Sequence, residues 1–139
     1  KVRHQQLVED LFCVGVTGTA LQWLMSYLSD RCQIVQLGSQ LSTVAACSCG
    51  VPQGSVLGPL LFSLYTRDIP SVAQQAESIQ FADDIALTCS RPTQQELTAT
   101  LSRAVTCIAD WLKQRGLILN ASKSQALVVP AGKLEAQTE

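Results

Sequence analysis

Apolar residues along this chain recur mainly at every third or fourth position, a spacing that predicts amphipathic helices. The segments with this spacing are residues 7–12, 21–28, 60–65 and 97–112. We expect Gly15 and Gly116 to end the first and the last helix, because glycine readily adopts the left-handed conformation that closes a helix. Thr93 and Glu96 are placed to form a capping box at the start of the last helix.

The same spacing predicts which side of each helix is buried. Residues three or four positions apart share one face of a helix, so the apolar members of each segment should point together into a core. The expected buried faces are Leu7, Val8, Leu11 and Phe12; Leu21, Leu24, Met25 and Leu28; Leu60, Leu61, Leu64 and Tyr65; and Leu97, Leu101, Val105, Ile108 and Leu112.

Strand-forming segments lie between these helices. Residues 32–37 and 43–49 flank Gly38 and predict a hairpin-like pair of strands. Short strands are expected at 117–119 and 125–129. Helices that alternate with antiparallel hairpins indicate a layered α+β domain.

A second hairpin is predicted at about residues 78–89, where two acidic residues interrupt an apolar run. Asp83 and Asp84 should lie at or beside its turn. Two carboxylates on a rigid hairpin present the hard oxygen ligands that Mg²⁺ prefers. Aspartate is also common in tight turns because its side chain bonds the local backbone. The pair alone therefore does not decide between a structural and a metal-binding role.

The composition is typical of the inner part of a protein, with little solvated surface of its own. Its 139 residues suit one domain or part of one, 47% of them are hydrophobic, and 15% are charged, against roughly 25% in a typical soluble domain. A net charge of −1 with ten Lys and Arg gives no sign of a free-standing nucleic-acid binder. No apolar run approaches the ~20 residues of a membrane span. Residues 131–139 are predicted to be a loosely ordered end.

The six cysteines do not have the spacing of metal ligands. Cys47 and Cys49 form a C-x-C pair, no second pair follows, and His4 is the only histidine. A zinc site is therefore not expected. We expect small, buried, free thiols instead.

A second motif gives the acidic pair its context. Residues 50–62 read GVPQGSVLGPLLF and residues 81–84 read FADD. They resemble motifs B and C of the reverse transcriptases of non-LTR (LINE-like) retrotransposons. Residues 23–35 resemble the block that these enzymes carry before motif B, and residues 116–123 resemble motif D. All four stand in the order of the family, over residues 1 to about 130.

This resemblance implies a fold and a reaction. The fold would be part of a polymerase palm, in which a small antiparallel sheet carries the acidic hairpin and helices pack behind it. The reaction would be RNA-directed DNA synthesis with two Mg²⁺ ions, for which Mn²⁺ could substitute. Asp83 would bind metal directly, and Asp84 is the second candidate. The implied partners are an RNA template, a DNA primer, dNTPs and the remainder of the polymerase. An enzyme of such an element would meet RNA in the cytoplasm and DNA in the nucleus.

Other residues acquire roles through the same resemblance. Gln53, Gly54 and Ser55 would lie against the template base and the incoming nucleotide, Lys123 would approach the pyrophosphate leaving group, and Phe81 would lie near the primer end. The residues alone suggest simpler roles. Gly54 and Ser55 are ordinary helix caps, Lys123 is a solvated lysine in a turn, and Phe81 packs under the hairpin.

One catalytic part of the family pattern is not found in this sequence. In the family, a further metal-binding aspartate and the fingers precede the helix expected at 7–12, and Asp10 and Asp30 are not expected to replace that aspartate. Residues 1–130 are thus expected to form a partial palm that is inactive alone. The alternative is a truncated or domesticated palm that acts as a binding or scaffold module. Other palm polymerases, such as group II intron maturases and viral RNA-dependent enzymes, suit residues 56–62 less well.

Overall fold

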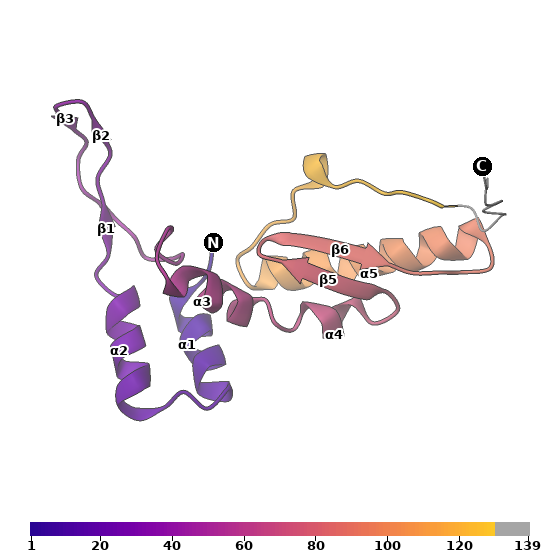
Figure 1. The fold of residues 1–139 in the computed structure, drawn as a ribbon, viewed down its shortest axis with the longest axis horizontal. Coiled ribbons are helices and arrows are strands. Elements are labelled where there is room, and N and C mark those ends of the chain that lie inside the picture. Colours follow the sequence, from indigo (N-terminus) through magenta and orange to yellow (C-terminus); the bar gives the residue numbers. More distant parts are fainter. Residues whose placement is uncertain (130–139) are drawn as a thin grey trace, which may run out of the picture.

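The computed structural model describes residues 1–129, and its elements form two groups that lie side by side (Figure 1). The first group contains α1 (His4–Cys13), α2 (Gly18–Leu28), β1 (Cys32–Gln33), β2 (Gln36–Leu37), β3 (Gln40–Leu41), β4 (Ala45–Ala46) and α3 (Leu57–Tyr65). The second contains α4 (Ile69–Ala73), β5 (Glu77–Phe81), β6 (Asp84–Thr88) and α5 (Gln94–Gln114). A short 3-10 helix, Ala121–Lys123, follows. The end predicted at residues 131–139 lies outside the described residues.

The predicted α+β class is confirmed, but the strands are arranged differently from the prediction. Instead of one small sheet, residues 1–129 form separate two-stranded antiparallel sheets: β1 with β4, β2 with β3, and β5 with β6. The strands expected at 117–119 and 125–129 are wrong, and only the 3-10 helix Ala121–Lys123 is found in that region. Neither segment pairs with another strand in the described part of the chain, so no ladder of backbone hydrogen bonds forms there.

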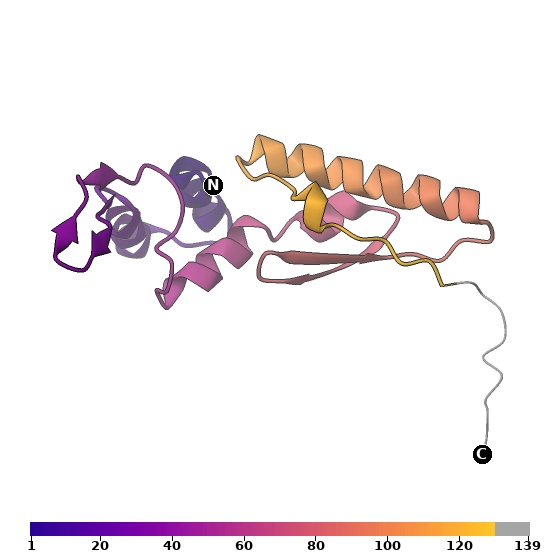
Figure 2. The ribbon, with the colours of Figure 1, turned by 90° about the horizontal axis from the view of Figure 1, so that it is seen from above.

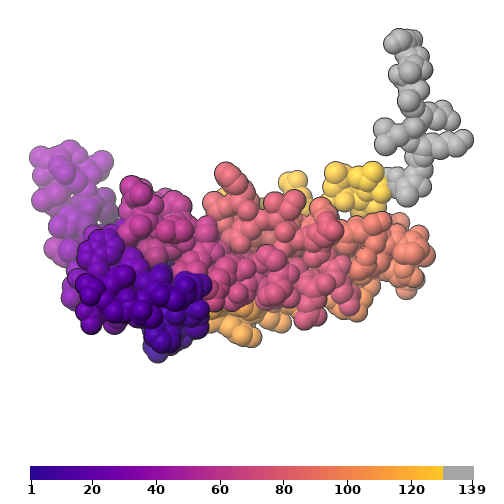
Figure 3. All heavy atoms as spheres, turned by 60° about the horizontal axis from the view of Figure 1, so that its bottom comes forward, coloured from indigo at the N-terminus to yellow at the C-terminus, as the bar shows by residue number. Residues whose placement is uncertain are grey.

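The first predicted hairpin is confirmed, with an interruption in its ladder. Cys32 pairs with Ala46 at its base, and β2 pairs with β3 near its tip. Between them, the N–H of Val35 donates to Oγ of Ser42 at 2.9 Å, and the N–H of Ser42 donates back to the carbonyl of Val35 at 2.9 Å. Every residue from 31 to 46 is exposed. Figure 3 shows this hairpin as a projection from the body of the molecule.

The first group of helices packs around one apolar core. Its buried members are Val2, Leu7, Leu11, Leu28, Leu61 and Tyr65. Three residues expected on buried faces are exposed instead: Phe12 by 60%, Met25 by 45% and Leu60 by 65%. In α3, the buried stripe runs from Leu61 to Tyr65, which are four positions apart. Leu60 is rotated about 100° from Leu61 around the helix axis and therefore faces away from the core.

The second group has a core of its own, between α4, α5 and the β5–β6 hairpin (Figure 2). Its buried members are Ile69, Ala73, Ile108 and Leu112. Ile85 and Leu87 of β6 pack against them, so one face of the hairpin is attached to the two helices. Each group of elements therefore has its own buried cluster, and Leu117 packs against both clusters.

The buried face of α5 contains smaller and more polar side chains than the apolar spacing predicted. Thr100 and Ala104 are only 2% and 4% exposed and continue the stripe of Ile108, whereas Val105, expected in the core, is 41% exposed. Small side chains at these positions let α4 pack closely against α5, and threonine and alanine contribute little to an apolar pattern. No helix in residues 1–129 is both long enough and apolar enough to cross a membrane.

Both ends of α5 are closed by local hydrogen bonds. At the start, Oγ1 of Thr93 accepts the N–H of Glu96 at 3.2 Å, which is one half of the predicted capping box. At the other end, the N–H of Leu117 donates to the carbonyl of Leu112 at 2.8 Å. Gly116, with φ of +76°, makes this turn possible, as predicted. A Cβ at Gly116 would also lie 3.0 Å from the carbonyl oxygen of Lys1, a tight contact that is a second reason for glycine at this position.

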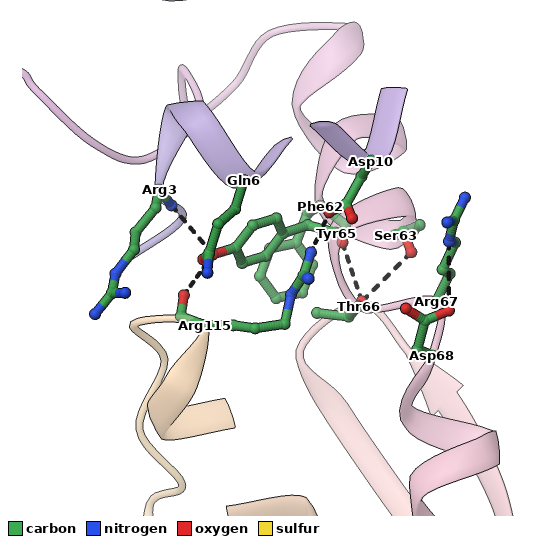
Figure 4. Close-up of polar contacts among 10 residues, drawn as sticks. All are labelled: Arg3, Gln6, Asp10, Phe62, Ser63, Tyr65, Thr66, Arg67, Asp68 and Arg115. Atoms are coloured by element: carbon green, nitrogen blue, oxygen red, sulfur yellow. Dashed lines mark hydrogen bonds and ion pairs between the residues drawn. The ribbon is translucent and has the colours of Figure 1, made fainter. Parts of the chain in front are cut away.

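A polar junction formed by Arg115 and Tyr65 joins the two groups (Figure 4). The Arg115 guanidinium, just past α5, forms an ion pair with Asp10 of α1, and the two side chains are only 15% and 12% exposed. Its Cζ lies 4.2 Å from the centre of the Tyr65 ring. The Tyr65 hydroxyl lies 2.8 Å from Oε1 of Gln6 and within hydrogen-bonding distance of the Arg115 carbonyl. The end of α5 is thus bound to both α1 and α3.

The cysteines are free thiols, as predicted, but they are not buried. Cys13, Cys32 and Cys107 are exposed, and Cys47, Cys49 and Cys89 are half-buried. Cys107 directly precedes a core residue of α5 but lies outside the buried stripe of that helix. The position of each thiol relative to its element, rather than its small apolar character, determines its exposure.

We predict that Arg115→Met lowers the free energy of unfolding by about 3 kcal/mol, because it leaves the Asp10 carboxylate buried without its partner. Arg67→Met is the matched control. Arg67 is paired with Asp68 at 3.4 Å, but their side chains are 34% and 49% exposed, and breaking such a pair costs less than about 1 kcal/mol. Urea unfolding of the chain and both variants measures the difference. Equal losses would contradict a structural role for the junction.

Candidate active site

The acidic pair lies where the sequence predicted it, at the tip of a hairpin. Phe81 pairs with Asp84 at the end of the β5–β6 ladder, and Ala82 and Asp83 form the two-residue turn between the strands. Both carboxylate residues are exposed. Side chains alternate along β6, so Ile85 anchors the hairpin to its core while Asp84 faces away from it.

The turn contains a residue in an unfavourable backbone conformation. Ala82 has φ of +53°, in the left-handed region that glycine usually occupies. An L-residue with a Cβ costs roughly 1–2 kcal/mol in that region. Strain of this kind persists only where surrounding contacts hold the residue in place. Here it lies directly beside Asp83.

Neither carboxylate of the pair is neutralised by a neighbour. Within residues 1–129, the ion pairs join Arg67 to Asp68 and Arg115 to Asp10, and neither involves the hairpin. No cluster of three or more His, Cys, Asp or Glu side chains that could hold a metal occurs in that range. The donor set is two exposed carboxylates on adjacent residues. This set fits an ion such as Mg²⁺, which takes few protein ligands and retains water.

Asp10 is a carboxylate whose role the sequence did not reveal. It was not expected to replace the further metal-binding aspartate of the family, and it proves to be 9% exposed and paired with Arg115. Its partner lies 105 positions away in the chain, so no local spacing could have indicated the pair. Asp10 is occupied in the junction and is not a ligand for the acidic turn. Asp30, also set aside, is an exposed residue with φ of +54°.

The glycine-rich loop forms the start of α3. Oγ of Ser55 donates to the carbonyl of Pro52 at 2.6 Å and accepts the N–H of Gly58 at 3.0 Å. This is the geometry of a helix cap. It also explains Gly58, because a Cβ there would lie 2.9 Å from the carbonyl oxygen of Pro52. The hydroxyl of Ser55 is therefore engaged within the protein.

Gln53 and Gly54 are the open part of this loop. Both are exposed, and a Cβ added to Gly54 would meet no atom within 4 Å. Glycine is nevertheless favoured at position 54, because the φ of this residue is +78°. The base of the loop is held by Gly50, whose N–H donates to the carbonyl of Val2 at 2.7 Å and whose carbonyl lies 2.7 Å from Nε2 of His4. Sequence reasoning had assigned no role to His4.

Phe81 contradicts the expectation from the residues alone that it packs under the hairpin. Its side chain is 82% exposed, and Ile79 on the same face is 67% exposed. Ser78 and Gln80 occupy the inner positions of β5 instead, because alternate residues of a strand face opposite sides. Phe81, Asp83 and Asp84 are thus gathered at the hairpin tip.

Lys123 stands apart from both clusters. It is exposed at the end of the 3-10 helix Ala121–Lys123. No hydrogen bond or ion pair within residues 1–129 joins it to the acidic turn or to the glycine-rich loop. The structure therefore gathers two groups of predicted site residues, the hairpin tip and the loop before α3, and leaves Lys123 outside them.

Known proteins resemble this chain closely enough to define its family. A family described as reverse transcriptase (RNA-dependent DNA polymerase) matches residues 1–137. A probable RNA-directed DNA polymerase from transposon BS of Drosophila melanogaster is 38% identical over 108 residues, which cover 73% of this chain and 12% of that protein. A probable RNA-directed DNA polymerase from transposon X-element of the same species is 34% identical over 105 residues, with the same coverage.

A more distant relative covers more of the chain. The retrovirus-related Pol polyprotein from type-1 retrotransposable element R2 of Popillia japonica is 25% identical over 143 residues, 94% of this chain and 19% of that protein. No solved structure matches. The chain spans 12% of the length of the BS and X-element relatives. From the family match and these relatives, which come from non-LTR transposons, we conclude that the chain belongs to the reverse transcriptase family.

Proposed function

We propose that this chain is part of the palm of an RNA-directed DNA polymerase from a non-LTR retrotransposon. The observation that carries the proposal is the pair of exposed carboxylates of Asp83 and Asp84 at a hairpin tip, which have no ion-pair partner within residues 1–129, in a chain of this family. The RNA template, the DNA primer and the dNTPs would bind across the hairpin tip and the loop before α3. The rest of the polymerase would pack against this chain and supply basic surfaces that these residues lack.

Asp83 and Asp84 are the residues that would hold two Mg²⁺ ions, or Mn²⁺ in their place. Bound divalent ions stabilise the attacking and leaving oxygens of a nucleotidyl transfer. Asp83, in the turn itself, would bind metal directly, and Asp84, at the first position of β6, would support the same site. The exposed ring of Phe81 on the neighbouring strand end is available to the primer end. The Lys123 ammonium would approach the pyrophosphate leaving group.

The loop before α3 would place the template base and the incoming nucleotide. Gln53 and Gly54 offer an exposed surface with open space above the glycine. A backbone without a Cβ allows close approach of a base. Ser55 would contribute through the shape of the loop, since its hydroxyl is already engaged by Pro52 and Gly58.

A binding or scaffold module without catalysis is the second candidate. It is favoured by the lack of a third metal-binding side chain beside Asp83 and Asp84 within residues 1–129. For the same reason, we propose that the isolated chain does not extend a primer, and robust extension by it would contradict this. A complete polymerase that contains this chain and synthesises no DNA would favour the scaffold.

In a complete polymerase that contains this chain, Asp83→Asn should lower kcat for primer extension at least about 100-fold, because it removes a metal-binding charge but suits a turn. Asp84→Asn should be milder. Asp68→Asn, at an exposed carboxylate paired with Arg67, is the control and should be near the parent. Primer extension on an RNA template with Mg²⁺ measures all three. Parental activity in Asp83→Asn would remove Asp83 from the metal site, and a larger loss in Asp84→Asn would exchange the two roles.

Gly54→Asn tests the substrate contact apart from backbone strain. Asparagine tolerates positive φ better than other residues with a side chain, and at Gly54 its side chain would enter the open space above the loop. We expect KM for dNTP to rise at least about 10-fold, equivalent to losing about 1.4 kcal/mol of binding, with little change in melting temperature.

Gly38→Asn is the matched control for this loop variant. Gly38 has φ of +60° and equally open surroundings, and it lies in the projecting hairpin. This variant should leave both KM and stability unchanged. A Gly54→Asn polymerase with parental KM and kcat would show that Gln53 and Gly54 do not contact the nucleotide or template.

A further inference from the structure

The strained turn beside Asp83 is held by one side chain from the preceding strand. The amide nitrogen Nε2 of Gln80 donates to the carbonyl oxygen of Ala82 at 3.0 Å and to Oγ1 of Thr66 at 2.6 Å. An amide NH₂ group has two hydrogens, so both bonds can form at once. Gln80 therefore connects the left-handed residue of the turn to another part of the molecule.

Thr66 is a fixed anchor for this connection. It lies directly after α3 and is 1% exposed. Its Oγ1 donates to the carbonyl of Phe62 at 3.0 Å, which leaves the lone pairs of the same oxygen for the Gln80 amide. A buried hydroxyl with both a donor and an acceptor bond has one favoured orientation. The acidic turn is thus fastened to the end of α3.

The strand pattern shows that Gln80 is placed on the inner face of the hairpin. Gln80 is half-buried, whereas its neighbours Ile79 and Phe81 are 67% and 82% exposed. An apolar residue would be expected at an inner position and a polar residue outside. A polar residue at this inner position can bond the core side of the hairpin, because only a side chain that points inward can reach Thr66. Ser78, the other inner polar residue of β5, has a buried hydroxyl with no partner within residues 1–129.

We propose that Gln80 is a positioning residue for the acidic pair: it holds the Ala82 carbonyl against the end of α3 and so fixes the turn that presents Asp83. Through α3, the same bonds link the turn to the loop at Ser55, which caps the opposite end of that helix. The part of this inference that concerns metal binding rests on the proposed function. The part that concerns the turn stands on the hydrogen bonds alone.

Gln80→Met is the test variant, because methionine keeps the length of the side chain and removes both hydrogen bonds. Amide hydrogen exchange over residues 79–88, measured without metal in a complete polymerase that contains this chain, reports on the turn. Loss of a hydrogen bond of ordinary strength predicts exchange at least about 5-fold faster at Asp83 and Asp84. Ser78→Ala, on the same face and without a bond to lose, should leave exchange unchanged.

Primer extension as a function of Mg²⁺ concentration provides the second readout. Gln80→Met should raise the Mg²⁺ concentration for half-maximal synthesis about 10-fold, as expected for losing one to two hydrogen bonds, while KM for dNTP stays within about 2-fold. Thr66→Val should reproduce part of this change. The Thr66→Val/Gln80→Met double variant should be no worse than Gln80→Met alone, because both substitutions remove the same link.

Stability and positioning can be separated with Ala82→Gly. Glycine adopts positive φ without strain, so Ala82→Gly in the Gln80→Met background should recover the melting temperature. It should not recover the Mg²⁺ dependence, because the bond that fixes the turn is still missing. Recovery of both would reduce Gln80 to a residue that only stabilises the fold, and would overturn the proposal.

The outcomes distinguish this inference from the proposed function. Parental exchange and parental Mg²⁺ dependence in Gln80→Met, with Asp83→Asn inactive, would overturn the role of Gln80 and leave the metal site in place. Parental synthesis in Asp83→Asn would instead refute the metal site. In that case the exchange data alone would decide whether Gln80 holds the turn.

Discussion

The Arg115 guanidinium lies between the Asp10 carboxylate and the Tyr65 ring, at the place where the two apolar cores meet. Each core buries its own helices, Leu117 packs against both cores, and the junction of Arg115 and Tyr65 adds polar bonds between them. Burying an ion pair this well shielded from water costs solvation free energy. The attraction between the two charges offsets that cost only where their geometry is good and further hydrogen bonds are made. Here the bonds of Arg115 and Tyr65 bring α1 and α3 together with the end of α5 (Figure 4).

That constraint determines how the proposed site is assembled. α3 begins at the loop of Gly54 and Ser55 and ends beside Thr66, which bonds Gln80 of the acidic hairpin. The hairpin itself is attached to α4 and α5 through Ile85 and Leu87. Loop and turn therefore belong to different cores, which are connected through α3, through the junction and through Leu117, a residue that packs against both cores. A shift at Arg115 would change the distance between them without altering either one locally.

The sequence predicted local structure well and long-range contacts poorly. Apolar spacing located α1, α2, α3 and α5 but not the short α4, and the acidic break located the turn with Asp83. The sequence did not reveal the ion pair of Asp10 with Arg115, because an ion pair between distant segments leaves no local pattern. It assigned Leu60 to the core, since within a run of apolar residues the spacing cannot say which of two adjacent positions faces inward. The inward position of Gln80 was hidden for the opposite reason, being polar where an apolar residue was expected.

Iron-dependent backbone cleavage tests the central claim, that the acidic turn binds the metal ions. Fe²⁺ replaces Mg²⁺ in many carboxylate sites, and with peroxide and ascorbate it cuts the nearest backbone. In a complete polymerase that contains this chain, the account predicts cleavage within residues 81–85, suppressed by excess Mg²⁺ and lost in Asp83→Asn. Mg²⁺-sensitive cleavage elsewhere, with residues 81–85 intact, would contradict it.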